Sequence, residues 1–335
     1  MDVFLTSPWL PPEWIRAHGM TPRGLWAAKN FPPRATPLAA GVCAFAEAAI
    51  QFADAHTKDT VIFSTHCDQL RRGCDLAQLH GQRHAFLFNL PVTWQTTAAK
   101  EIFRAELERL GQFLRSLGGR IPYAKHLRHE LELSAAARTQ LLAAATANSP
   151  RDFAAAVAQF HRDGTASTPP PAVAPARQIP LALVGGPLFA PHWPLFDEIE
   201  SAGGRVVLNA TETGERSLCP AFDFAAHSST DTPATPFDVL VHGYCDHLVD
   251  VFQRPNTRLY AWLKPRLAAR QVRGIVLWHF TGCDLWRAEF QTLRETFGLP
   301  VLLLEAGAEP GLTPREQTRL QAFVETLERA TPVLA

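Results

Sequence analysis

The second half of the chain alternates short, continuous apolar runs with amphipathic stretches, a pattern that few folds accept. The apolar runs are residues 179–188, 205–210, 273–280 and 299–306. The amphipathic stretches are residues 192–204, 258–271, 284–298 and 313–330. A run that is apolar throughout indicates a strand buried on both faces, which is typical of a parallel sheet covered by helices. The pattern therefore predicts an α/β domain over residues 179–335.

The first half carries elements of the same two kinds. Strands are predicted at residues 23–28, 59–63 and 84–91, and helices at 98–119, 128–147 and 150–162. In the first of these helices, apolar residues return near helical spacing, and a Gly-Gly pair at 118–119 is expected to end it. Its buried face is predicted to contain Ile102, Leu107, Leu110, Phe113, Leu114 and Leu117.

A stretch rich in Pro, Ala, Ser and Thr separates the two halves. It has too few large apolar side chains to form a core, so we expect an extended connector. A chain of 335 residues is also too long for one ordinary core. We predict an N-terminal α/β domain with a helical extension over residues 1–162, a linker over 163–178 and a C-terminal α/β domain over 179–335. Both would be Rossmann- or flavodoxin-like, with parallel sheets, and the N-terminal and mid-chain segments would be helical.

Charge and hydropathy exclude several classes of protein. The 32 basic and 32 acidic residues cancel, and no basic stripe is interleaved with aromatics, so no nucleic-acid partner is expected. No run approaches the roughly 18 apolar residues of a membrane span, and the N-terminus lacks the basic start of a secretion signal. We expect a cytoplasmic protein, whose six cysteines are thiols or metal ligands rather than disulfides.

Three cysteines lie where a functional group is expected. Ligands of open parallel sheets bind beyond the carboxyl ends of the strands. Cys67 follows the strand predicted to end at Phe63, and Cys283 follows the one ending near Phe280. Cys43 is expected to begin a helix, where the dipole and free amide groups favour a thiolate. Because a lone cysteine is usually a small buried apolar residue, placement alone leaves the ligand role open.

The remaining candidates carry weaker signals. Cys74 lies one helical turn past Cys67, and Cys219 and Cys245 lie in poorly patterned sequence. His279, shortly before Cys283, is read either as a ligand or base or as a hydrogen-bonded structural residue. The sequence contains no phosphate-binding loop of the G-x-x-x-x-G-K-[ST] or G-x-G-x-x-G kind, so nucleotide chemistry is not expected in this chain.

Several stretches, in the same order along the chain, resemble the 2-hydroxyacyl-CoA dehydratase D-component family, to which 2-hydroxyglutaryl-CoA dehydratase and benzoyl-CoA reductase subunits belong. The stretches are PPEWIRAHGMTPR (11–23), CAFAEA (43–48), STHCDQLRRGCD (64–75), GGPLFAPHWPLFDEIESAGGRVVLNATETGER (185–216), FTGCDLWRAE (280–289) and QTRLQAFVE (317–325). They span nearly the whole chain, and the ordered set is more specific than any one motif.

The resemblance implies a [4Fe-4S] cluster held by three cysteines, with one iron left open for a substrate oxygen. On the matching motifs these ligands are Cys43, Cys67 and Cys283. Asp68 and Asp284, which directly follow two of the ligands, are expected to orient them or to buffer charge around the cluster.

The resemblance also implies a reaction and its partners. A separate ATP-hydrolysing iron–sulfur activator would load the cluster with one electron. That electron would pass to the thioester carbonyl of an acyl-CoA and give a ketyl radical anion, which expels the 2-hydroxyl group. A related dehydratase or reductase subunit would complete a homo- or heterodimer. Glu13, in the first motif, is the candidate catalytic acid or base; its other reading is a charge at a helix N-terminus.

Three alternatives remain open at this point. The chain could be a subunit of a benzoyl-CoA reductase-type aromatic-ring reductase, in which the electrons enter the ring. It could be a non-catalytic partner subunit that relays electrons or completes a dimer. It could also be a thiol protein without a cluster.

Overall fold

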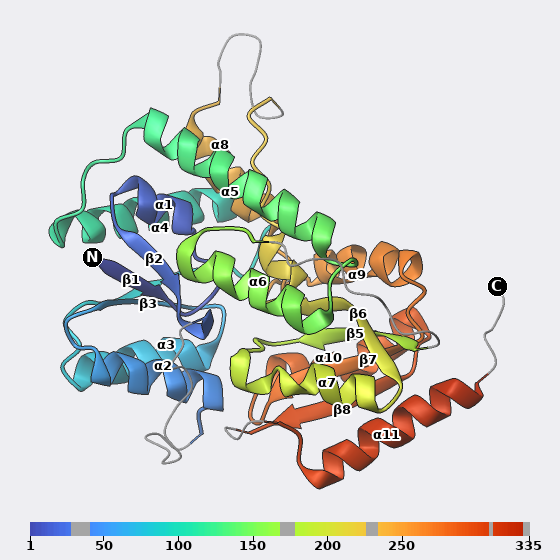
Figure 1. Ribbon diagram of the computed structural model, residues 1–335. Helices are drawn as coiled ribbons and strands as arrows, with labels where there is room; N and C mark the ends of the chain where they lie inside the picture. Colours follow the sequence, from blue (N-terminus) through green and yellow to red (C-terminus); the bar gives the residue numbers. More distant parts are fainter. Residues whose placement is uncertain (28–40, 168–177, 226–233, 308–310, 331–335) are drawn as a thin grey trace.

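The computed structural model describes residues 1–27, 41–167, 178–225, 234–307 and 311–330. These residues form two four-stranded sheets with the strand orders β2-β1-β3-β4 and β6-β5-β7-β8, and all the strands in each sheet are parallel. Helices cover both sheets (Figure 1). The predicted class, two Rossmann- or flavodoxin-like α/β units with parallel sheets, is confirmed.

The N-terminal sheet is built from four short strands. They are β1 (Asp2–Leu5), β2 (Thr21–Gly24), β3 (Thr60–Ser64) and β4 (Ala85–Phe88), with α1 (Pro12–Ala17), α2 (Ala44–Ala55) and α3 (Asp68–Leu79) between them. The strand β1 was not predicted, although it pairs with both β2 and β3. The strand predicted over residues 23–28 ends early, because Leu25–Ala27 form the 3-10 helix η1.

A layer of long helices lies beyond this sheet. It contains α4 (Thr97–Ser116), α5 (Ala124–Ala144) and α6 (Pro150–Asp163), together with α8 (Pro236–His247). The helix α8 comes from the second half of the chain, yet it packs against α4 and α5 (Figure 1). The helix α6 contacts β2 of one sheet and β6 of the other, so it connects the two halves.

The predicted buried face of α4 is correct at its centre and wrong at one end. Leu107, Leu110 and Leu114 are fully buried, whereas Ile102 is 53% exposed. The neighbouring Phe103 is buried instead. The helix therefore turns Ile102 to the solvent side, one position away from the face that packs on the sheet.

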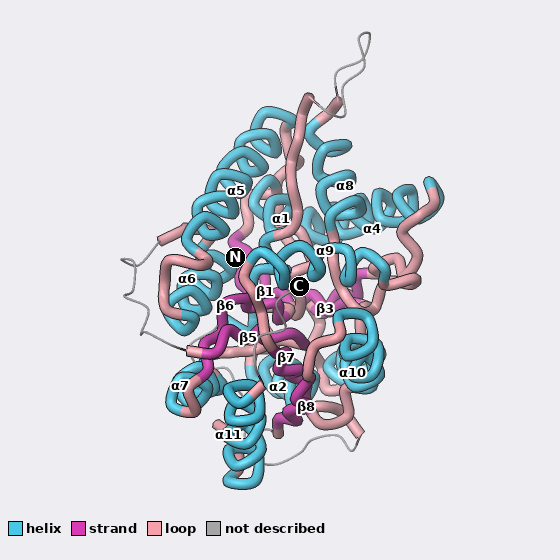
Figure 2. The backbone as a smooth tube through the Cα atoms, turned by 90° about the vertical axis from the view of Figure 1, so that its right-hand side faces the viewer, coloured by secondary structure: helices cyan, strands magenta, loops and turns pink. Residues whose placement is uncertain are grey.

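The C-terminal sheet follows the predicted alternation closely. Its strands are β5 (Ile179–Gly185), β6 (Gly204–Thr211), β7 (Gly274–Phe280) and β8 (Val301–Ala306). Its helices are α7 (Pro194–Ser201), α9 (Thr257–Ala269), α10 (Asp284–Phe297) and α11 (Pro314–Arg329), with the 3-10 turns η2 (Ala190–His192) and η3 (Glu215–Leu218). Helices α7 and α11 share one hydrophobic cluster and α9 and α10 another, on opposite faces of the sheet (Figure 2).

Two further sequence predictions concern the linker and membrane spans. Of the predicted linker, 163–178, residues 168–177 lie outside the described part of the chain, and the proposed domain borders stay a prediction. In the described residues, no helix is both long enough and apolar enough to cross a membrane.

Candidate functional site

The three cysteines singled out from the sequence line one cavity. It has an empty volume of about 500 Å³ and is bounded by residues from both halves of the chain. Besides Cys43, Cys67 and Cys283, its lining consists of Phe45, His66, Leu70, Gly186, Pro187, Glu212, Asp250, Val251, Phe280, Leu285 and Trp286. Three thiols that are remote along the chain therefore converge, while their role as metal ligands stays a prediction.

Each of the three cysteines is the N-cap residue of a helix. Cys43 precedes α2, Cys67 precedes α3 and Cys283 precedes α10; a helix start at Cys43 was predicted. The first backbone N–H groups of a helix have no partner within it, and the helix dipole adds positive potential at the same end. Three helix N-termini thus meet around one cavity, which favours negative charge there.

Burial disfavours the thiolate at all three positions in the absence of metal. Burial raises the pKa of Cys67 to about 12, and the neighbouring Cys43 adds to the rise. Burial also raises the pKa of Cys283 to about 12, with contributions from Cys43 and Cys67. Because the pKa of Cys67 responds to Cys43, and that of Cys283 to both, the three thiols lie within electrostatic reach of one another. Metal binding would have to displace their protons.

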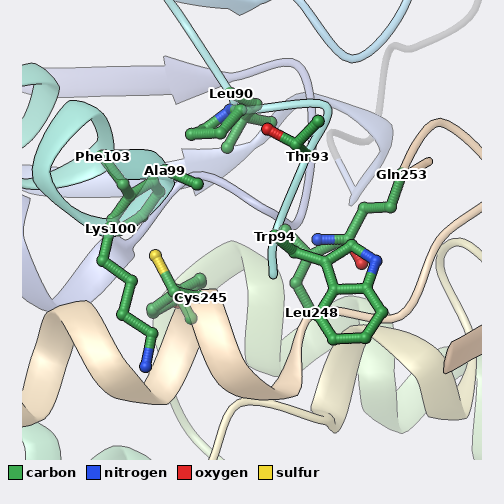
Figure 3. A pocket seen from close by; sticks show the side chains of 11 residues that line it. Leu90, Thr93, Trp94, Ala99, Lys100, Phe103, Cys245, Leu248 and Gln253 are labelled. Carbon is green, nitrogen blue, oxygen red and sulfur yellow. The ribbon is translucent and has the colours of Figure 1, made fainter. Parts of the chain in front are cut away.

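A raised pKa does not by itself mark a ligand. Burial raises the pKa values of Cys74, Cys219 and Cys245 to about 12 as well. Cys74 is buried within α3, and Cys219 lines a separate groove. Cys245 lines an apolar cavity of about 310 Å³ beside α4 (Figure 3), whose one charged group, Lys100, is paired with an aspartate. What distinguishes the other three cysteines is that they share a cavity.

Cysteine thiolates are the ligands that iron–sulfur clusters use. In the part of the chain that the structure describes, no three His, Cys, Asp or Glu side chains come close enough together to hold one metal ion. In a [4Fe-4S] cluster each cysteine binds a different iron, so the sulfurs surround a cavity and do not need to meet at one point. The three thiols of this mostly apolar cavity therefore fit such a group by their chemistry, and its presence stays a prediction.

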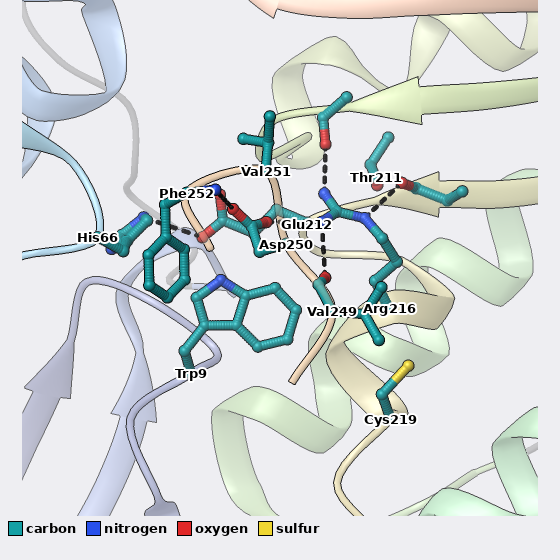
Figure 4. A network of polar contacts seen from close by, with 12 residues as sticks. Trp9, His66, Thr211, Glu212, Arg216, Cys219, Val249, Asp250, Val251 and Phe252 are labelled. Atoms are coloured by element: carbon teal, nitrogen blue, oxygen red, sulfur yellow. Dashed lines mark hydrogen bonds and ion pairs between the residues drawn. The ribbon is translucent and has the colours of Figure 1, made fainter. Parts of the chain in front are cut away.

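A polar wall, formed by His66 and Glu212, belongs to the same cavity, and the sequence analysis assigned no role to it. His66 and Glu212 both line the cavity, and His66 Nε2 lies 3.5 Å from Glu212 Oε1 (Figure 4). The other ring nitrogen of His66 lies 2.7 Å from Ser64 Oγ. Burial works against a charged imidazole, but the Glu212 carboxylate outweighs it and the pKa of His66 is raised. Both residues follow strand ends, the same signal that identified Cys67 and Cys283.

A buried arginine supports this wall from behind. Arg216 is fully buried and donates to Asp250 Oδ2 at 2.6 Å (Figure 4). It also donates to the carbonyl oxygens of Ala210, Gly185 and Val249 at 2.7, 2.6 and 3.0 Å. One guanidinium group therefore joins the ends of β5 and β6 to the loop that carries Asp250.

The remaining predicted site residues lie elsewhere. Among the described residues that line the cavity, neither Glu13 nor Asp68 nor Asp284 occurs. Glu13 is fully buried beside Arg138, whereas Asp68 and Asp284 are exposed at the starts of α3 and α10. Their suggested roles stay predictions.

The histidine at the end of β7 has a backbone contact. The ring nitrogen Nδ1 of His279 lies 3.0 Å from the Phe280 carbonyl oxygen. The side chain is buried, and it is not among the described residues that line the cavity of the three cysteines.

Comparison with known proteins agrees with this arrangement. Residues 9–327 match the model of one family, described as 2-hydroxyglutaryl-CoA dehydratase, D-component. The match includes the C-terminal sheet, the N-terminal sheet without its strand β1, and all three cysteines of the cavity. No curated protein matches the sequence. The chain belongs to the 2-hydroxyglutaryl-CoA dehydratase D-component family.

Proposed function

We propose that this chain is a cytoplasmic iron–sulfur subunit of a 2-hydroxyacyl-CoA dehydratase, with a [4Fe-4S] cluster on Cys43, Cys67 and Cys283. Membership of the family makes it a component of a dehydratase-type system. One observation carries the finer proposal: three cysteines from distant segments line one cavity. The reaction would be the elimination of water from a 2-hydroxyacyl-CoA thioester.

The cluster would supply a low-potential electron and an open iron for a substrate oxygen. The chain itself supplies the surroundings. Phe45, Leu70 and Phe280 give the cavity an apolar lining, which disfavours water beside a bound group. His66 and Glu212, which line the same cavity, offer polar groups that can hold and orient a ligand. The helix N-termini behind the cysteines favour negative charge developing in this space.

Two partners belong to the proposal. ATP hydrolysis would reside in a separate iron–sulfur activator, since the sequence carries no phosphate-binding loop. A second, related subunit would complete the enzyme as a homo- or heterodimer. The substrate would be an acyl-CoA.

Iron analysis tests the cluster directly. After anaerobic purification or reconstitution, we expect a brown protein solution with about four irons per chain. Cys43→Ala, Cys67→Ala and Cys283→Ala should each lower the iron content and bleach the colour. Cys219→Ala and Cys245→Ala are matched controls that should keep both. An unchanged iron content in the first three variants, or a lowered iron content in the two controls, would contradict the ligand assignment.

An activity assay separates the possible roles. The subunit is mixed with an activator, ATP and a panel of 2-hydroxyacyl-CoA and aryl-CoA thioesters, and water elimination and ring reduction are followed separately. Dehydration is the expected outcome. Turnover of aryl-CoA thioesters alone would assign a ring reductase of the benzoyl-CoA type. Activity could also require a second related subunit and be unaffected by the three cysteine substitutions in this chain. That result would make this chain a non-catalytic partner.

A further inference from the structure

The side chain of Gln69 connects the segments of all three cysteines. Gln69 lies in the first turn of α3, two residues after Cys67. Its Oε1 accepts a hydrogen bond from the backbone N–H of Cys43 at 2.6 Å. Its Nε2 donates to the carbonyl oxygen of Gly282, the residue before Cys283, at 2.7 Å. One carboxamide therefore hydrogen-bonds to the backbone of Cys43 and of Gly282, and its own residue lies two positions after Cys67 in the sequence.

The two bonds use the two ends of the carboxamide. The Cys43 N–H needs an acceptor and the Gly282 carbonyl needs a donor, and the carboxamide supplies both on separate atoms. A carboxylate of the same size only accepts, and asparagine is one carbon shorter. The bond to Gly282 also crosses from the N-terminal to the C-terminal half of the chain. Gly282 has φ +83°, a left-handed conformation that fixes the turn leading into Cys283.

We infer that Gln69 is a positioning residue that sets Cys43 and Cys283 relative to Cys67 and so keeps the cavity ready for its metal group. Naming an iron–sulfur cluster as that group rests on the proposed function. The positioning itself concerns the thiols and the backbone beside them, and it is measurable without iron. Hydrogen bonds of this kind narrow the range of positions available to ligating side chains.

The first experiment measures cysteine alkylation in the full-length chain after iron has been removed. Iodoacetamide is added under reducing, anaerobic conditions, and the rate at each cysteine is read by mass spectrometry of peptides. In Gln69→Ala, Cys43 and Cys283 should react roughly fivefold faster, the effect of losing about one hydrogen bond at each. Cys74, buried in the same helix, should keep its rate.

The variant Gln69→Glu separates the two bonds. A carboxylate still accepts from the Cys43 N–H but cannot donate to the Gly282 carbonyl. Its negative charge disfavours both thiolates, so the expected result is a rise in the rate at Cys283 relative to the rate at Cys43. Gln78→Ala is the matched control, because Gln78 lies in α3 and bonds the Ala85 carbonyl at 3.3 Å, away from the cavity. Unchanged rates in Gln69→Ala would overturn the inference. Equal acceleration of Cys74 would also overturn it, since Gln69 would then only stabilise α3.

A second experiment uses the iron-loaded chain. Gln69→Glu places a negative charge beside the cysteines, so the midpoint potential of the cluster should fall, whereas Gln78→Ala should leave it unchanged. An unchanged potential in Gln69→Glu would overturn the inference for the loaded protein. If the unmodified chain binds no iron at all, the proposed function fails, and the alkylation rates still decide the role of Gln69.

Discussion

Glu13 and Arg138 form an ion pair that is closed off from solvent. Glu13 Oε1 lies 3.0 Å from Arg138 Nη2, and the two side chains are 0% and 3% exposed. Ser134 donates to the same carboxylate, and Tyr244 donates to its other oxygen at 2.9 Å. These residues lie on α1, α5 and α8. One carboxylate therefore joins the start of the chain, the helical layer and the second half.

Glu13→Gln should destabilise the protein at neutral pH. The substitution keeps the size of the side chain but leaves the Arg138 guanidinium buried without its counter-charge. Breaking a buried pair on one side lowers the free energy of unfolding by about 3–5 kcal/mol, which urea denaturation would measure. Asp68→Asn, in an exposed pair with Arg71, is the control and should change it little. A stable Glu13→Gln variant without activity would instead support a catalytic role for Glu13.

The same pair predicts a pH dependence. Burial alone would raise the pKa of Glu13, but Arg138, Arg16 and a hydrogen bond from Ser134 outweigh it and hold this pKa below its usual 4.5. A carboxyl group with a lowered folded-state pKa stabilises the fold above its unfolded pKa, and the contribution is lost as the pH falls through the folded pKa. Below about pH 4.5, stability should therefore fall more steeply in the unmodified chain than in Glu13→Gln. Parallel curves of urea midpoint against pH would contradict this.

The positions of Cys67 and Cys283 could be predicted because they depend on local order along the chain. Each follows an apolar strand, and the carboxyl ends of parallel strands form the binding edge. The same rule applies to His66 and Glu212, but it was used only for the cysteines, although His66 directly precedes Cys67 in the same motif. Gln69 carried no signal, since a polar residue in the first turn of a helix normally faces solvent.

The elements that were missed lack the periodicity that sequence reasoning uses. The strand β1 has only four residues, too few to show a pattern. In α8, Val239, Leu240 and Val241 are all buried, because α8 lies against α4 and α5. A helix with apolar residues on several sides shows only a weak apolar–polar periodicity. The partners of Glu13 could not be found either, since Arg138 and Tyr244 are remote in sequence.

Gly185→Ala should severely destabilise the C-terminal sheet. Gly185 ends β5 with φ +150°, and a Cβ atom there would lie 1.8 Å from the Trp278 carbonyl oxygen. Since that atom belongs to the neighbouring strand β7, the sheet would have to open. Gly298→Ala is the control: its φ is +63°, and no described atom lies within 4 Å of its added Cβ, so it should lose only about 1–2 kcal/mol. Thermal unfolding of both variants measures the difference, and equal losses would contradict the steric argument.

Arg216→Met tests whether the wall behind the cavity must be charged. The substitution leaves Asp250, which lines the cavity, as a buried carboxylate without the guanidinium 2.6 Å away. We expect the free energy of unfolding at pH 7 to fall by about 3–5 kcal/mol, together with loss of reconstituted iron.

The double variant Arg216→Met, Asp250→Asn separates an uncompensated charge from lost packing. Removing the Asp250 charge as well should restore part of the stability that Arg216→Met loses. A deficit caused by lost contacts with the Trp286 ring, whose centre lies 4.6 Å from the guanidinium carbon, would remain in the double variant. Urea midpoints of both variants and the unmodified chain distinguish the two causes, and no recovery in the double variant would mean that Arg216 acts by filling space and not by its charge.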